Sequence, residues 1–129
     1  MSQFGSVPKL EHVGICVPKE KFDATLAFYE TVFGWHRIRE VPGRLAFIGD
    51  GDGGRIELVI DDVPALPKPH HGAFVLPIEE LDAAVATLEA AGAKCDPVST
   101  GPTGDKLLFF YDPAGNYMQI VGRLNALGR

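Results

Sequence analysis

The sequence contains two similar segments, and an internal repeat of this kind limits the possible folds more than any other feature. Each segment opens with a strand-like run that carries a histidine, Leu10–Val17 in the first and His71–Pro77 in the second. A proline follows each histidine by six residues, and a glycine that ends a helix-like run follows it by 22 or 21 residues. The repeat predicts two half-domains of about 55 residues, whose equivalent polar residues can face one another and form a binding site.

Hydrophobic periodicity predicts the same order of elements, βαβββ, in both segments. In the first segment we expect a helix over Lys19–Phe33 and strands over Leu10–Val17, Trp35–Val41, Arg44–Ile48 and Arg55–Ile60. In the second we expect a helix over Glu79–Ala91 and strands over His71–Pro77, Ala93–Val98, Lys106–Tyr111 and Tyr117–Gly122. The fold class is therefore α+β, with one module over about residues 9–60, a proline-containing linker over 61–69 and a second module over about residues 70–122.

Length and charge exclude several classes of function. A chain of 129 residues fits one domain. A net charge of −5 argues against a general nucleic-acid binder and against a polybasic membrane anchor. No apolar run approaches the roughly 20 residues that span a bilayer, and the N-terminus lacks the pattern of a secretory signal. Two cysteines do not make a disulfide framework. We expect a cytoplasmic protein that binds neither nucleic acid nor membrane.

Four polar residues share one face of the predicted strands, because successive side chains on a strand point to opposite faces. These residues are His12, Glu57, His71 and Gln119. The opposite faces are apolar and are expected to pack against the two helices, so that the polar set lines a concave face. Each module would then contribute one imidazole and one carbonyl-type oxygen.

With these features the chain resembles the vicinal oxygen chelate superfamily, the group of glyoxalases, bleomycin-resistance proteins and extradiol dioxygenases. The resemblance covers about residues 9–122 and implies paired βαβββ modules in a cupped mixed sheet with helices on its outer face. It also implies a homodimer, and the modules pair either within a chain or across the dimer. The motifs that carry the resemblance are Glu11-His12-Val13-Gly14, Phe28-Tyr29 with Phe33-Gly34-Trp35, His71, and Asp112-Pro113-Ala114-Gly115-Asn116.

The resemblance also implies a metal site, because enzymes of this superfamily take ligands from the first, fourth, fifth and eighth strands. Those positions correspond to His12, Glu57, His71 and Gln119. His70 is adjacent to His71, but strand alternation favours His71. Two imidazoles, one carboxylate and one amide oxygen suit a divalent ion such as Zn²⁺, Ni²⁺, Co²⁺, Mn²⁺ or Fe²⁺. Taken singly, each histidine is more often an ordinary strand residue, and the matching positions in both modules favour ligation.

The reaction that the resemblance implies is proton loss next to a carbonyl, with a metal-stabilised enediolate. Lactoylglutathione lyases and methylmalonyl-CoA epimerases share this step. The lyases usually carry a glutamate on the eighth strand, where this chain has Gln119. An amide coordinates but does not accept the proton, so Glu57 is the candidate base. We therefore expect a divalent-metal-dependent lyase or isomerase of glyoxalase type, acting on a small substrate with adjacent oxygens.

Three alternatives remain open. A methylmalonyl-CoA-epimerase-like activity would need a second acid, which the four residues do not supply. An Fe²⁺-dependent dioxygenase could use His12, His71 and Glu57, although the superfamily's dioxygenases usually place the carboxylate on the eighth strand. A metal-free protein of the antibiotic-sequestering type would use the cup for capture alone. Arg55 shares the face of Glu57 and is a candidate contact for an anionic substrate.

Overall fold

The computed structural model describes residues 2–61 and 70–129, so most of the predicted linker lies outside the described residues. The chain divides into two compact units. We call His12–His70 with Leu127–Arg129 the N-terminal unit, and Met1–Glu11 with His71–Ala126 the C-terminal unit. The first residues of the first strand therefore belong to the C-terminal unit, and the last three residues of the chain belong to the N-terminal unit.

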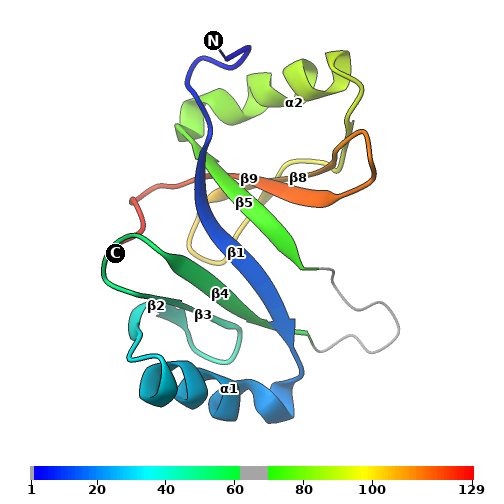
Figure 1. The fold of residues 1–129 in the computed structure, drawn as a ribbon. Helices are drawn as coiled ribbons and strands as arrows, with labels where there is room; N and C mark the ends of the chain where they lie inside the picture. The colour runs from blue at the N-terminus through cyan, green and yellow to red at the C-terminus, as the bar shows by residue number, and fades with distance from the viewer. Residues whose placement is uncertain (1, 62–69) are drawn as a thin grey trace. The chain divides into compact units, whose positions relative to one another are not determined.

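Strands and helices follow one another largely as the periodicity predicts, and the α+β class is confirmed (Figure 1). β1 (Lys9–Val17) is followed by α1 (Lys19–Val32), β2 (His36–Val41), β3 (Leu45–Gly49) and β4 (Arg55–Ile60). In the second half the order is β5 (His71–Leu76), a 3-10 helix (Ile78–Glu80), α2 (Leu81–Ala90), β6 (Lys94–Cys95), β7 (Ser99–Thr100), β8 (Lys106–Tyr111) and β9 (Tyr117–Gly122).

Both units build a mixed sheet on the same plan. In the N-terminal unit the strand order is β2-β3-β4-β1, and β1 and β4 are parallel with Gly14 beside Glu57. In the C-terminal unit the order is β5-β9-β8-β6, and β5 and β9 are parallel with Ala73 beside Gln119. The other strand pairs within each unit, including β3 with β4 and β8 with β9, are antiparallel. The first and last strands of each module are therefore neighbours.

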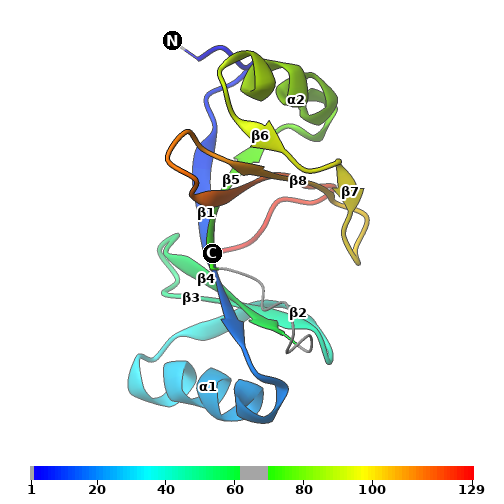
Figure 2. The ribbon, with the colours of Figure 1, turned by 90° about the vertical axis from the view of Figure 1, so that its right-hand side faces the viewer.

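Each helix covers one face of the sheet in its own unit (Figures 1 and 2). In the N-terminal unit, Phe22 and Leu26 of α1 pack on a buried apolar cluster that includes Ile48 and Leu58. In the C-terminal unit, Leu81 and Ala84 of α2 belong to a cluster with Leu76, Leu108 and Ile120. The helices thus lie on the apolar faces, opposite the strand positions of the four predicted polar residues.

The predicted strand over Ala93–Val98 is wrong as one element. Within this range the structure has only the short strand β6; a second short strand, β7, follows the range, and both strands pair with β8. The interruption covers residues 96–98 and includes Pro97. Proline has no N–H to donate to a strand neighbour, so a ladder cannot pass through it unbroken. The N–H of Asp96 donates to the carbonyl of Phe109, which keeps the segment beside β8 across the break.

The hairpins β3–β4 and β8–β9 turn by the same device, although their loop sequences differ. Oδ1 of Asp50 accepts the N–H groups of the second and fourth following residues at 2.7 and 3.0 Å. Oδ1 of Asp112 accepts the corresponding groups at 3.0 and 2.8 Å. The third following residue is Gly53 in one loop and Gly115 in the other, and both have the positive φ that glycine adopts at little cost. The repeat thus extends to the loops.

Among the described residues, no helix has the length and apolar character that crossing a membrane requires.

Candidate metal centre

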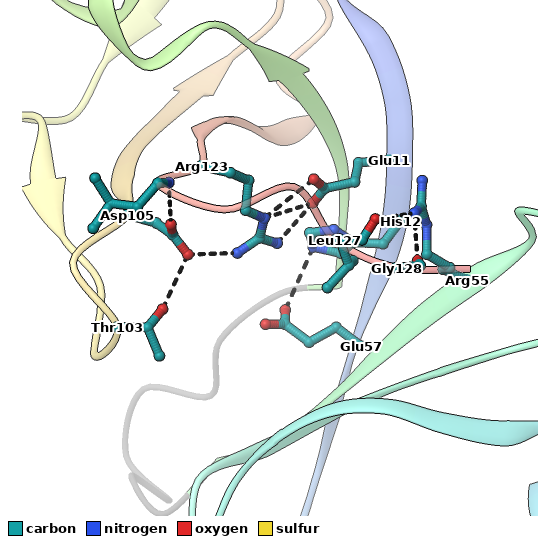
Figure 3. A network of polar contacts seen from close by, with 10 residues as sticks. Glu11, His12, Arg55, Glu57, Thr103, Asp105, Arg123, Leu127 and Gly128 are labelled. Carbon is teal, nitrogen blue, oxygen red and sulfur yellow. Dashed lines mark hydrogen bonds and ion pairs between the residues drawn. The ribbon is translucent and has the colours of Figure 1, made fainter.

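The N-terminal unit brings together the two site residues predicted in it. His12 on β1 and Glu57 on β4 lie on neighbouring parallel strands, on the face opposite α1. Nε2 of His12 is 3.6 Å from Oε1 of Glu57 (Figure 3). The side chains are 1% and 12% exposed, respectively. An imidazole and a carboxylate therefore point toward each other in a nearly closed environment.

The separation of these two atoms fits shared ligation of one ion. Hydrogen bonds of this type have heavy-atom distances of about 2.7–3.2 Å, and the observed separation is longer. Two ligand atoms bonded to one ion at about 2.1 Å lie roughly 3.0–3.4 Å apart at tetrahedral or octahedral angles. The His12 and Glu57 atoms are close to that range, so a small side-chain movement would let both bind one divalent ion.

Phe47 packs beside both His12 and Glu57. It lies directly opposite Glu57 in the β3–β4 register and is almost fully buried. Its ring meets the His12 ring edge to face, with centroids 5.0 Å apart. This contact restricts the rotation of the imidazole and excludes water from one side of it. Interactions between charges strengthen where water is excluded, so the polar pair is in a setting that favours a bound cation.

The C-terminal unit holds the other two predicted residues on one face. His71 begins β5 and Gln119 lies on the neighbouring strand β9, where it pairs with Ala73. Both residues are buried. The His71 ring meets the rings of Phe109 and Tyr117 edge to face at 5.5 and 6.4 Å. Those two aromatic rings stack in parallel with centroids 5.1 Å apart. Each unit thus presents one imidazole and one side-chain oxygen on the face away from its helix.

The structure separates His70 from His71. His70 precedes β5 and is exposed. Its Nδ1 accepts the backbone N–H of Cys16 at 3.1 Å. His70 therefore has a main-chain role at the end of β1, whereas the His71 ring is buried on the face of Gln119.

Arg55 shares the face of Glu57 but binds the end of the chain. Its Nη1 donates to the carbonyl oxygens of Leu127 and Gly128 at 3.1 and 2.7 Å (Figure 3). The Leu127 side chain is buried. In this arrangement the guanidinium anchors the last residues on the N-terminal unit, and a substrate anion would have to compete with two carbonyl groups for it.

Sequence reasoning missed a buried ionic network in the C-terminal unit. Arg123 lies between two carboxylates, Glu11 and Asp105, with its nearest contacts at 2.7 and 2.8 Å (Figure 3). Burial alone would lower the pKa of Arg123, but the hydrogen bonds and charge of Glu11 and Asp105 outweigh it and raise that pKa. No local pattern signals this network, because Glu11 and Arg123 are 112 residues apart in sequence.

Comparison with known proteins agrees with this fold and places the chain in a family. The profile of the Glyoxalase/Bleomycin resistance protein/Dioxygenase superfamily matches residues 9–120. The chain belongs to this superfamily. No curated protein sequence matches it.

Solved structures with the same fold include methylmalonyl-CoA epimerases. A single-residue variant of the Streptomyces coelicolor epimerase, in complex with 2-nitronate-propionyl-CoA, is 22% identical with a TM-score of 0.74, and the match covers 96% of this chain and 100% of that one. The Mycobacterium tuberculosis epimerase is 20% identical with a TM-score of 0.73, over 91% and 89% of the chains. A hypothetical protein from Bacillus halodurans C-125 is 17% identical with a TM-score of 0.74, over 96% and 100%. At these identities the likeness concerns the fold.

Proposed function

We propose that this protein is a divalent-metal-dependent lyase or isomerase of glyoxalase type. Its substrate is a small molecule with two adjacent oxygens, from which a proton is removed next to a carbonyl. The observation that carries the proposal is the buried approach of His12 Nε2 to Glu57 Oε1 at 3.6 Å, which suits two ligands of one ion. The matching face of the C-terminal unit, with His71 and Gln119, supplies the same types of donor atom.

The proposed site takes one imidazole and one oxygen from each module, within one chain or across a homodimer. His12, Glu57, His71 and Gln119 are its ligands, and this donor set suits Zn²⁺, Ni²⁺, Co²⁺, Mn²⁺ or Fe²⁺. A divalent ion bound there would act as a Lewis acid and stabilise the negative charge that develops on the substrate oxygens. The edge-to-face contacts of Phe47 with His12 and of Phe109 with His71 hold both imidazoles in orientation.

Glu57 is the proposed base. It is the single carboxylate of the four residues, and its apolar neighbours Phe47 and Leu58 are buried. A carboxylate that accepts a proton from one carbon can return it to the neighbouring carbon, which is what isomerisation requires. Gln119 takes no part in proton transfer, because an amide has no useful basicity near neutral pH.

Epimerisation of an acyl-CoA is the second candidate, because similar solved structures are methylmalonyl-CoA epimerases. That reaction needs proton removal on one side of the carbon and delivery on the other. Incubation in deuterium oxide with the hemithioacetal of methylglyoxal and glutathione, and separately with methylmalonyl-CoA, distinguishes the two candidates. Product from the hemithioacetal favours the lyase, and inversion of methylmalonyl-CoA favours the epimerase. Capture of a ligand without exchange or turnover favours a metal-free binding protein.

We propose further that the enzyme works in the cytoplasm as a homodimer, as the superfamily resemblance implies. Size-exclusion chromatography with light scattering measures the assembly state directly.

Metal analysis of the purified protein tests the proposed site. We expect one divalent ion per pair of modules in the wild type and loss of the ion in His12→Ala and in His71→Ala. His70→Ala is the matched control for the second variant, because His70 is the adjacent residue and binds the backbone of Cys16. Wild-type protein that carries no divalent ion and cannot be loaded with one would contradict the proposal, as would full retention of the ion in either variant.

A further inference from the structure

Two successive residues of β1 are held by different units. The side chain of Glu11 binds Arg123 within the C-terminal unit. The next residue, His12, lies beside Glu57 in the N-terminal unit. Because one peptide bond joins these residues, the position of the Glu11 backbone limits where the His12 imidazole can reach.

Both carboxylate oxygens of Glu11 accept hydrogen bonds from Arg123. Arg123 donates from Nε to both carboxylate oxygens at 3.2 and 3.1 Å and from Nη2 to Oε1 at 2.7 Å. Its Nη1 donates to Oδ2 of Asp105 at 2.8 Å. A planar guanidinium with several fixed donors determines orientation as well as distance, which a lysine ammonium does not.

Asp105 in turn binds the side chain of Arg123 and the backbone N–H of the next residue, Leu124. Besides the guanidinium, it accepts the N–H of Leu124 at 2.7 Å through Oδ1 and the hydroxyl of Thr103 at 3.0 Å through Oδ2. Burial alone would raise the pKa of Asp105, but these hydrogen bonds and the charge of Arg123 lower it below the ordinary value. Asp105 is thus ionised in the folded protein at neutral pH. Its carboxylate fixes both the guanidinium of Arg123 and the backbone that follows this residue.

The network differs from the exposed ion pairs of Arg37, which also lies between two carboxylates. The side chains of Arg123, Glu11 and Asp105 are 9%, 3% and 5% exposed, whereas that of Arg37 is 48% exposed. Exposed ion pairs contribute little to stability and separate readily in water. A buried charged group keeps its partners, because leaving a buried charge unpaired costs free energy. The buried network is therefore suited to fix a backbone position.

We propose that Arg123 and Asp105 are positioning residues for the metal ligand His12, acting through Glu11. This inference rests on the proposed metal site. The network sets the place of β1 at Glu11, and the His12 imidazole then reaches the ion in the geometry set by Glu57 and Phe47. If the network is disturbed, all four ligands remain in the chain, but His12 binds the ion less well.

The first test uses Arg123→Lys, which keeps the charge and removes the planar fork. Co²⁺ is titrated into the metal-free protein in competition with a chromophoric chelator, and the visible spectrum of bound Co²⁺ is recorded. We expect about tenfold or greater loss of affinity, as for residues that orient metal ligands, together with an altered spectrum. Arg37→Lys is the matched control and should keep both values. Leu108→Ala changes the buried apolar cluster against α2 and controls for lost stability. Wild-type affinity and spectrum in Arg123→Lys would overturn the inference.

A second readout separates this inference from the proposed metal site. The ring ¹⁵N resonances of His12 are compared in the metal-free wild type and Arg123→Lys. We expect them to move in Arg123→Lys and to stay in Arg37→Lys. If the wild type binds no ion, the proposed function fails, and these resonances alone decide the inference. Unchanged His12 resonances would refute positioning through Glu11. If Arg123→Lys does not fold, Asp105→Asn is judged by the same two measurements and outcomes.

Discussion

The two modules share one plan but surround their polar residues differently. In the N-terminal unit an imidazole and a carboxylate approach to 3.6 Å beside one buried ring, Phe47. In the C-terminal unit the imidazole meets the stacked pair Phe109 and Tyr117, and the oxygen donor on the neighbouring strand is the amide of Gln119. The repeat thus accounts for the shared scaffold and for the matching strand positions of the four proposed ligands. In the proposed mechanism, proton transfer depends on a single difference, a carboxylate in one module and an amide in the other.

The largest expected effect comes from removing that difference in the N-terminal unit. Glu57→Gln keeps the shape and an oxygen ligand but removes the base, so turnover should fall by roughly 10²–10⁴-fold. Exchange of the substrate proton with solvent deuterium should stop, while binding of the substrate remains measurable by calorimetry. Glu40→Gln is the control, because Glu40 pairs with Arg37 at the exposed edge strand β2. Undiminished turnover in Glu57→Gln would exclude Glu57 as the base.

A smaller effect is expected from making the two modules more alike. Gln119→Glu adds a second carboxylate ligand and should tighten binding of a divalent ion by about tenfold, because ligand charge is one determinant of affinity. It also adds a second group able to exchange a proton. Chelator competition measures the affinity, and deuterium incorporation into the substrate measures the exchange. An unchanged affinity would indicate that residue 119 is not a ligand.

The smallest effect concerns the matching hairpin loops. Hydrogen bonds lower the pKa of both aspartates, from the Asp52 N–H to Asp50 and from the Asn116 side chain and N–H to Asp112. Because the folded-state pKa is below the unfolded one, their stabilisation is present above pH ~4 and is lost as pH falls through the folded-state value. Asp50→Asn and Asp112→Asn should each lower the unfolding temperature at pH 7, with the difference shrinking below pH ~4. A constant difference across this range would contradict the account of the loops.

Much of the fold was accessible from sequence because strand and helix periods differ and recur in both modules. Strand alternation also grouped His12 with Glu57 and His71 with Gln119, and within each unit the structure has both members of the pair on the face away from the helix. The break at Pro97 was missed because the apolar pattern continues through it.

The Arg123 network and the return of Leu127–Arg129 to Arg55 were missed for a different reason. They join residues far apart in sequence, and their side chains have no local period that could reveal the partner. The shared turns at Asp50 and Asp112 were hidden because the same hydrogen bonds are made by different loop residues. Local patterns predicted elements and faces, whereas these contacts depend on tertiary structure.

The most direct test of the central claim, that both modules supply ligands to one ion, is NMR of histidine-labelled protein with bound Co²⁺. The chain has four histidines, which makes assignment by single substitution practical. If both modules supply ligands, the ring resonances of His12 and His71 shift strongly at one equivalent of Co²⁺ per pair of modules, and those of His36 do not. Shifted resonances for only one of His12 and His71, or for neither, would contradict this claim.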